Sequence, residues 1–121
     1  MSEATHKAAL CKVLRSKLPV GDGKVFRHED AFSGGIPDIS ISYRGRTLWV
    51  EVKLTKNGRR SKVTELQSKV LRELRGTLLT FEEYKDGTLG ATIGATMDSD
   101  KWLQFREIIP CKVKSLVYKD V

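Results

Sequence analysis

The 121-residue chain has few cysteines, few histidines and no long apolar run. Its two cysteines, Cys11 and Cys111, are too few and too widely separated for a disulfide framework or a zinc cluster, so we expect buried, reduced thiols. No segment approaches the roughly 20 apolar residues that span a bilayer, and the first residues do not resemble a secretory signal. We therefore expect a cytoplasmic protein with no membrane partner, either bacterial or, if phage-encoded, in the host cytoplasm.

Two enzyme classes lack the motifs that they require. Neither histidine, His6 or His28, lies in a recognisable nucleophile motif, which argues against a serine or cysteine hydrolase. The glycines form no Gly-x-x-x-x-Gly-Lys-Ser/Thr loop, so nothing supports an ATP-driven activity.

Basic residues exceed acidic ones, 22 to 15, which gives a net charge of +7 and a pI near 9.6. Such an excess is typical of a small domain that binds a polyanion, although solubility alone would account for it too. Four basic residues follow Lys53 closely and predict a flexible loop that contacts phosphates: Lys56, Arg59, Arg60 and Lys62. Arg44 and Arg46 predict a second contact. The alternative is a solvated run of charge without a role.

The order of predicted elements indicates one α/β domain over residues 1–121, with a mixed β-sheet flanked by two helices. Apolar residues recur at helical spacing in the predicted helices and alternate in the predicted strands. The predicted helices are 3–18 and 61–75, with a shorter turn at 100–106. The predicted strands are 24–29, 39–43, 47–53, 77–84 and 88–96, with an extended segment at 112–118.

The centre of this pattern is a predicted hairpin that turns at Arg44-Gly45. Folding the chain there pairs residues whose numbers sum to 89, so that Ile39 faces Val50 and Asp38 faces Glu51. Because side chains alternate between faces, Asp38, Glu51 and Lys53 would share one face of the sheet.

Two carboxylates opposed across strands lie roughly 4.5–5.5 Å apart at their Cβ atoms and repel each other. A hard divalent cation such as Mg²⁺, or Mn²⁺, relieves this repulsion by taking oxygen ligands from both. Lys53 would lie beside the cation and could orient a water that attacks phosphorus. The alternative is a solvated sheet face with mixed charges. The combination of Asp38, Glu51 and Lys53 predicts phosphodiester hydrolysis.

The pattern Pro37-Asp38 … Glu51-Val52-Lys53 resembles the PD-(D/E)xK nuclease superfamily. Gly35-Ile36-Pro37-Asp38-Ile39 and Val50-Glu51-Val52-Lys53 are most similar to the VRR-NUC group, related to Holliday junction resolvases, over roughly residues 1–84. The resemblance implies a restriction-endonuclease-like core. It further implies a metal held by Asp38, Glu51 and the main-chain carbonyl of Val52, with Lys53 assisting the water.

The resemblance also implies two residues on helices. Gln67 matches a glutamine that these nucleases often carry behind the active strand; the alternative is an ordinary exposed helical residue. A further acid often comes from the first helix, and Glu3 is the first choice because it shares a helical row with Leu10 and Leu14. His6 and Glu29 are alternatives, and a glutamate in a first helical turn is also favoured by the helix dipole alone.

The resulting prediction is a metal-dependent, structure-specific DNA endonuclease. The resemblance implies branched DNA such as a four-way junction, cut by a homodimer whose two-fold symmetry suits two opposed strands. A group of apolar residues near the carboxyl end would form either the dimer interface or the core of the protomer: Trp102, Phe105, Ile108 and Ile109. The alternatives are a nuclease-fold protein that binds nucleic acid without cutting it, and a sequence-specific duplex endonuclease.

Overall fold

The alternating sequence around Arg44-Gly45 forms the predicted hairpin. In the computed structural model, β2 (Ile39–Tyr43) pairs antiparallel with β3 (Arg46–Lys56). The register is the predicted one, with Ile39 opposite Val50 and Ser42 opposite Thr47. Arg44 and Gly45 form the turn with positive φ angles of 50° and 77°. The inward side chains of the hairpin are almost completely buried, because alternation places all of them on one face.

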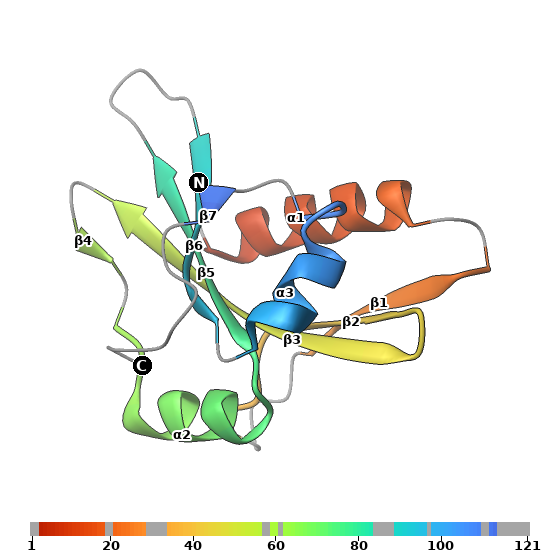
Figure 1. The fold of residues 1–121 in the computed structure, drawn as a ribbon. Coiled ribbons are helices and arrows are strands. Elements are labelled where there is room, and N and C mark those ends of the chain that lie inside the picture. Colours follow the sequence, from red (N-terminus) through yellow and green to blue (C-terminus); the bar gives the residue numbers. More distant parts are fainter. Residues whose placement is uncertain are drawn as a thin grey trace.

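The structure describes residues 3–18, 21–28, 34–56, 59–60, 62–83, 89–96, 98–109 and 112–113. The remaining elements in chain order are α1 (Glu3–Lys17), β1 (Gly23–Arg27), β4 (Arg59–Arg60), α2 (Glu65–Glu73), β5 (Thr77–Glu83), β6 (Leu89–Thr96), α3 (Ser99–Phe105) and β7 (Lys112–Val113). The fold is α/β with a mixed sheet flanked by helices, which confirms the predicted class (Figure 1).

The described strands form one sheet in the order β1-β2-β3-β5-β6-β7, with β4 paired to the end of β3. The β3–β5 and β6–β7 pairs are parallel and the others are antiparallel. The parallel β3–β5 pair requires a crossover connection, and α2 supplies it. As a result, the residues that follow Glu51 in the sequence return to the same part of the sheet.

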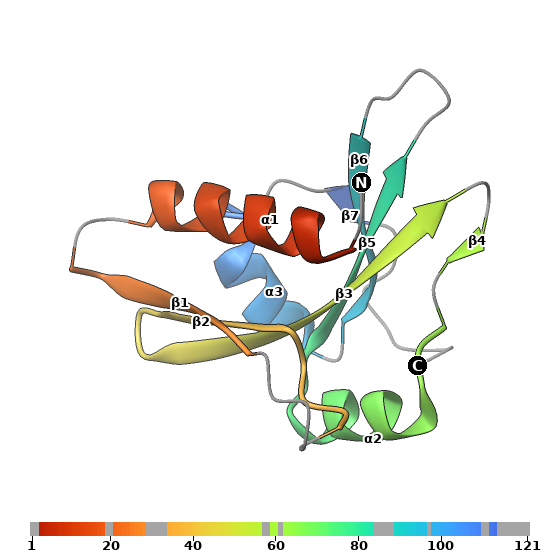
Figure 2. The same ribbon diagram turned by 180° about the vertical axis from the view of Figure 1, so that it is seen from behind.

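Helices cover the two faces of the sheet unequally. α1 and α3 pack on one face, and α2 lies on the other, as Figures 1 and 2 show from opposite sides. The main core lies under α1 and α3 and includes Leu14, Ile41, Leu48 and Trp102. A smaller cluster joins Leu71 of α2 to Leu78 of β5, with Val63 packed against it. We call the α1–α3 side the inner face and the α2 side the outer face.

The structure corrects several predicted bounds. α2 begins at Glu65 rather than residue 61, because Thr64 caps it, and a third helix, α3, joins the two that were expected to flank the sheet. β1 ends at Arg27 rather than residue 29. Of the extended segment predicted over 112–118, the structure describes Lys112–Val113 as β7. Residues 84–88, where the strands predicted at 77–84 and 88–96 meet, lie outside the described residues.

The predicted basic loop after Lys53 is wrong. β3 continues to Lys56, and Arg59–Arg60 pairs back onto it as β4, with Thr55 opposite Arg60 and Lys56 opposite Arg59. The β-branched and aliphatic residues before Lys56 favour continuation of the strand, and Asn57-Gly58 is a sequence typical of a tight hairpin turn. Lys56, Arg59 and Arg60 therefore lie on paired strands, and Lys62 follows β4 in the sequence.

No described helix has both the length and the apolar character needed to cross a membrane. Cys11 is buried in the core with a free thiol, as predicted, and burial raises the pKa of that thiol. Cys111 lies outside the described residues.

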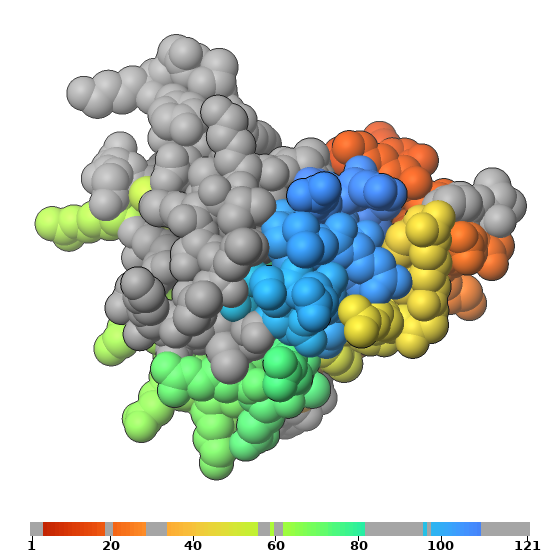
Figure 3. Space-filling view, in the orientation of Figure 1, coloured from red at the N-terminus to blue at the C-terminus, as the bar shows by residue number. Residues whose placement is uncertain are grey.

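The space-filling view shows α3 (blue) seated between the hairpin tip (yellow) and α1 (Figure 3). Gln104 Nε2 of α3 donates to the Tyr43 carbonyl at 3.4 Å in this contact.

Candidate active site

Asp38 lies where β2 separates from β3. The backbone ladder of the hairpin ends at Ile39–Val50. The predicted register paired Asp38 with Glu51, and this prediction is wrong for the main chain. Instead, the Asp38 carboxylate Oδ2 accepts a hydrogen bond from the Val52 amide at 2.8 Å. The Asp38 side chain thus replaces the missing strand neighbour of Val52, and this contact fixes its position relative to Glu51.

The backbone before Asp38 reaches this point through Gly35. Gly35 has a φ of +96°, a conformation that side-chain-bearing residues rarely adopt. A Cβ atom there would lie 2.7 Å from Cγ of Leu66 on α2. The glycine in Gly35-Ile36-Pro37-Asp38 is therefore needed for both backbone conformation and close contact with α2.

Glu51 is a buried carboxylate, only 2% exposed, on the outer face of β3. The Asp38 carboxylate is close enough for its charge to act on Glu51, so the predicted proximity of the two carboxylates is present. Burial, followed by the charge and hydrogen bond of Asp38, raises the pKa of Glu51 from 4.5 to about 8, against smaller opposing effects of Lys53 and Lys7. Its Oε2 is buried and has no hydrogen-bond partner among the described residues.

Lys53 lies beside Glu51 on the same face, as strand alternation predicted. Its Nζ is 3.8 Å from Glu51 Oε1 and donates a hydrogen bond to Gln67 Oε1 at 3.1 Å. The lysine is only 6% exposed. A buried ammonium group held by two acceptors has little freedom to move, so its charge is fixed next to the carboxylates.

Gln67 is oriented by the capping of α2. Its Oε1 also accepts from the Thr64 amide at 3.0 Å, while Thr64 Oγ1 accepts from the Gln67 amide at 3.1 Å. This reciprocal arrangement is a capping box at the amino end of the helix. The structure therefore places Gln67 at the site, as the resemblance implied, and the half-buried side chain is not an ordinary exposed residue.

Lys7 is a site residue that the sequence interpretation missed. Its Nζ forms an ion pair with Asp38 Oδ1 at 3.0 Å, and both side chains are largely buried. Lys7 lies one turn after Glu3 on the helical row that leads to Leu10 and Leu14. Lys7 is therefore on the same helix face as Glu3, because positions three and four apart share a face, and helical periodicity alone is enough to identify it.

The described residues fit a divalent cation. Asp38 and Glu51 supply carboxylate oxygens, and the buried, unpartnered Oε2 of Glu51 is an acceptor that a cation would satisfy. Mg²⁺ commonly takes one or two carboxylates and retains several waters. Within the described part of the chain, no third histidine, cysteine or acidic side chain joins this pair. The main-chain carbonyl of Val52 lies on the strand between Glu51 and Lys53, as the resemblance requires.

The candidates for a further ligand have different positions. Glu3 begins α1, but its side chain lies outside the described residues, as does Glu29. His6 is buried, and its ring stacks on Phe81 with centroids 5.4 Å apart. This places His6 against the inner face of the sheet, in a packing role.

The predicted nucleic-acid-binding residues fall in two places. Arg59 and Lys62 are exposed near the β3–β4 hairpin, whereas the side chains of Lys56 and Arg60 lie outside the described residues. Arg44 and Arg46 are exposed at the tip of the β2–β3 hairpin, where the Arg44 guanidinium lies 4.9 Å from the Tyr43 ring centroid. The two groups lie at separate ends of the sheet in Figure 1.

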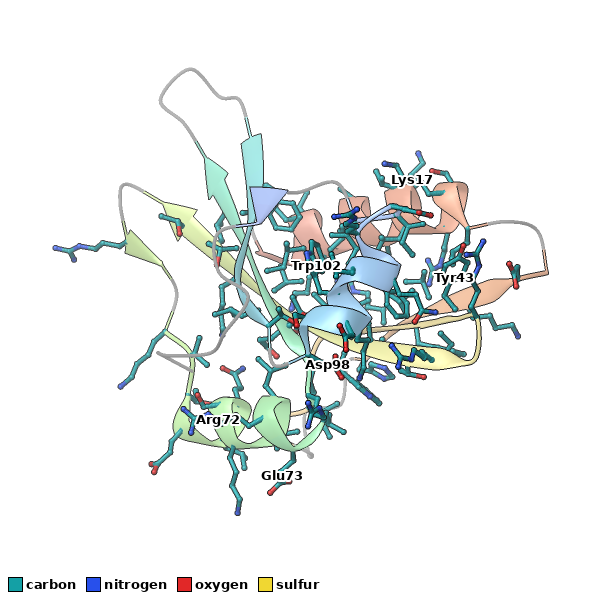
Figure 4. All side chains as sticks on the ribbon, in the orientation of Figure 1. Lys17, Tyr43, Arg72, Glu73, Asp98 and Trp102 are labelled. Atoms are coloured by element: carbon teal, nitrogen blue, oxygen red, sulfur yellow. The ribbon has the colours of Figure 1, made fainter. Side chains whose placement is uncertain are left out.

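The apolar residues offered for a dimer interface belong to the core of the protomer. Trp102 is 1% exposed, Phe105 0%, Ile108 5% and Ile109 4%, and all pack with α1 and the inner face of the sheet. Figure 4 shows Trp102 directed into the space between α3 and α1. The core alternative for these residues is therefore confirmed.

Comparison with models of known protein families gave no match, and comparison with curated proteins also found no significant relative.

Proposed function

We propose that the protein is a metal-dependent, structure-specific endonuclease that hydrolyses phosphodiester bonds in branched DNA such as four-way junctions. The observation that carries the proposal is the buried cluster of Asp38, Glu51 and Lys53. Glu51 is desolvated beside a second carboxylate, and its pKa is raised to about 8. Buried, strongly perturbed ionisable groups are concentrated at functional sites.

Each residue of the cluster has a task in this reaction. Asp38 and Glu51 would hold Mg²⁺ or Mn²⁺, and a bound cation of this kind polarises the phosphate and lowers the pKa of a coordinated water. Hydrolysis joins a water oxygen to phosphorus and breaks a phosphorus–ester bond, so negative charge develops on the phosphoryl oxygens. Lys53 would orient the attacking water and offset that charge.

Gln67 and Lys7 act through these groups. Gln67 accepts a hydrogen bond from Lys53 and so is a positioning residue for the ammonium group. Lys7 balances the charge of Asp38 in the metal-free protein. Arg59, Lys62, Arg44 and Arg46 supply positive charge for phosphates outside the cluster, which agrees with the net charge of +7.

One observation favours a second function, nucleic-acid binding without cleavage. Both Asp38 oxygens already have partners, Lys7 and the Val52 amide, so the cluster also satisfies the description of a structural ion-pair network. The buried, unpartnered Oε2 of Glu51 favours catalysis, because the great majority of buried acceptors in structural networks have a hydrogen-bond partner.

The test is cleavage of end-labelled DNA presented as a four-way junction, a flap, a sequence-randomised duplex and a single strand. Each is incubated with Mg²⁺, Mn²⁺ or EDTA, with wild-type protein, Asp38→Asn, and Asp22→Asn as an exposed control. We expect metal-dependent cutting of at least one structure, lost in Asp38→Asn and retained in Asp22→Asn. Binding without cutting under every metal condition supports the second function, and cutting of one duplex sequence alone would indicate a sequence-specific enzyme.

Homodimer formation stays a proposal that follows from the two-fold symmetry of a four-way junction. The interface would have to use residues other than the buried group around Trp102. Sedimentation of the protein alone and with a junction measures the stoichiometry directly.

A further inference from the structure

A row of ring-bearing and hydroxyl side chains crosses three strands on the outer face of the sheet. Phe26 of β1 is paired with Ser40 of β2, and Ser40 is paired with Trp49 of β3. Directly paired residues of antiparallel strands point to the same face, so the three side chains lie in line. His28, two residues after Phe26, stacks on Trp49 with ring centroids 5.1 Å apart. We call Phe26, His28, Ser40 and Trp49 the aromatic strip.

The rings of the strip are held in place but remain accessible. The Phe26 side chain is 47% exposed, whereas His28 and Trp49 are half-buried. His28 Nε2 and Ser40 Oγ are hydrogen-bonded at 2.8 Å, and Ser40 itself is buried beneath the rings. An exposed aromatic ring contributes less hydrophobic stabilisation than a buried one. An exposed ring beside a fixed stack forms a flat apolar surface that suits a planar partner.

The strip is continuous with the carboxylate cluster. Trp49 and Glu51 project from the same face of β3 two residues apart, which corresponds to roughly 6.5–7 Å along a strand. The His28 amide donates to the Asp38 carbonyl at 2.8 Å, so the end of β1 is tied to the residue that carries the other carboxylate. A ligand group bound at Asp38 and Glu51 therefore has the strip as its immediate neighbour.

No helix of the described residues covers this part of the outer face. α2 lies beneath the β3–β5 side of the sheet, away from β1 and β2, in both views (Figures 1 and 2). Between the hairpin tip and the cluster, the outward side chains of the three strands are Lys24, Phe26, His28, Ser40, Ser42, Thr47 and Trp49. None carries negative charge and one is a lysine, so these side chains present no charge that repels a polyanion.

We infer that the aromatic strip stacks the unpaired bases of a nucleic-acid strand whose backbone enters the Asp38–Glu51 site. Aromatic rings bind any base through its π-face, but only when the base is out of a duplex. The strip thus selects single-stranded segments, as in flaps, gaps and the opened centre of a junction. The inference rests on the proposed function for its choice of DNA as the strand, and it specifies which part of the DNA is recognised.

The two tryptophans of the chain make the test direct, because Trp102 is buried in the core and Trp49 lies in the strip. Wild-type protein is titrated in EDTA with a short oligothymidylate and with a blunt duplex of equal length, while tryptophan emission and fluorescence anisotropy are recorded. We expect the single strand to quench Trp49 emission. Phe26→Ala should weaken single-strand binding about tenfold or more, the loss associated with one stacked base, with little effect on the duplex.

Three variants make the experiment specific. Leu103→Ala removes an equally exposed apolar side chain on α3, 47% exposed like Phe26, and should bind as wild type does. Phe26→Tyr keeps the ring and should restore binding. Phe26→Ala should leave the salt dependence of binding unchanged, whereas Arg59→Ala should lower its slope by about one, because only the arginine is expected to contact a phosphate.

Equal single-strand affinity of Phe26→Ala and wild type overturns the inference, as does an unchanged Trp49 emission on binding. A change from dimer to monomer in Phe26→Ala, seen by sedimentation, also overturns it and assigns the face to contact between copies. Because the titration is done in EDTA, it is independent of cutting. Stacking without any cleavage would refute the proposed nuclease and leave the inference standing. Cleavage by the wild-type protein, together with unchanged single-strand affinity in Phe26→Ala, would support the nuclease and refute the inference.

Discussion

At the scale of single residues, burial and one neighbouring carboxylate determine the ionisation of Glu51. The raised pKa, about 8, means that the metal-free folded protein binds a proton more tightly than the unfolded chain does. The stabilisation is complete below the unfolded value of 4.5 and is lost as the pH rises through about 8. Metal binding must displace that proton, so metal affinity should increase over the same pH range.

We therefore predict that the metal-free protein loses stability between pH 5 and pH 9, by an amount on the order of a few kcal/mol. Thermal melts in EDTA across this range measure the effect. Glu51→Gln, which cannot ionise, should flatten the profile, whereas Glu73→Gln on the exposed surface of α2 should leave it as in wild type. Parallel profiles for Glu51→Gln and wild type would show that the Glu51 carboxyl is ionised in the folded protein as it is in the unfolded chain.

Gln67 joins the capping of α2 to the position of Lys53, and two variants separate these roles. Gln67→Ala removes the acceptor of the Lys53 ammonium, so the proposed cleavage rate should fall about 10- to 100-fold, as expected for a hydrogen bond to a charged group. Thr64→Ala removes the cap but leaves that acceptor, and should lower stability by about 1 kcal/mol with little change in rate. Single-turnover cleavage measures the rate of each variant, and thermal melts measure its stability. A similar loss of cleavage rate in both variants would contradict the positioning role of Gln67.

The residues of the cluster differ in how far they could be predicted. Asp38, Glu51 and Lys53 lie in or beside one hairpin, where strand alternation alone assigns the face of Glu51 and Lys53. The Asp38–Lys7 ion pair joins residues 31 positions apart, one on α1 and one just before β2, and depends on how α1 packs against the sheet. The Lys53–Gln67 bond was expected from the family resemblance, but its geometry depends on the capping box of α2.

At the scale of elements, α3 is a short helix whose stability depends on its first turn. Asp98 caps it, accepting a hydrogen bond from the Lys101 amide at 3.0 Å, and this bond lowers the pKa of Asp98. The ion pair between Asp98 and Arg75 contributes little to the stability of the fold, because the arginine side chain is 63% exposed. Since α3 carries Trp102 and Phe105 into the core, fraying of this turn would expose the main core (Figure 4).

Asp98→Ala should therefore lower the free energy of unfolding by about 1 kcal/mol, measured by urea denaturation at neutral pH. Because a lowered pKa gives stability that is present above the unfolded pKa, the difference from wild type should shrink as the pH falls through the acid range. Asp100→Ala changes an exposed carboxylate in the same turn and should have a smaller effect, through the helix dipole alone. An equal loss in the two variants would assign the effect to charge rather than to capping.

The β3–β4 hairpin shows why one element was predicted incorrectly. A dense run of basic residues after Lys53 favoured a loop, because charge usually accompanies solvent exposure. The pairing of Thr55 with Arg60 instead extends the strand beyond the cluster. Charged side chains are tolerated on an edge hairpin, where they also discourage pairing with other chains. Charge therefore predicted the exposure of Arg59 but not its backbone conformation.

At the scale of the whole molecule, one sheet separates two apolar clusters of unequal size. The larger lies under α1 and α3, and the smaller holds α2 through Leu71 and Leu78. α2 carries Gln67, so the site lies between a well-packed face and a lightly packed helix. This arrangement places the groups proposed to bind substrate on the side of the sheet with less burial.

Trp102→Ala should destabilise the protomer by about 3–5 kcal/mol without changing its association state, because the side chain is buried within one chain. Urea denaturation measures the first quantity and sedimentation the second. Leu103→Ala, next in sequence but exposed, should change stability by less than about 0.5 kcal/mol. A Trp102 variant that is a stable monomer where wild type is a dimer would return this residue to an interface.

The sequence by itself determined the hairpin, its register, the faces of its side chains and the α/β class, because all four follow from periodicity and turn chemistry over short stretches of chain. It also located the acidic and basic residues from which the nuclease prediction was made. Only the tertiary structure decided the burial of Glu51, the approach of Lys7, the assignment of Trp102 to the core and the exposed aromatic strip. These depend on contacts between elements distant in sequence, and their energies arise from exclusion of water, which local patterns do not encode.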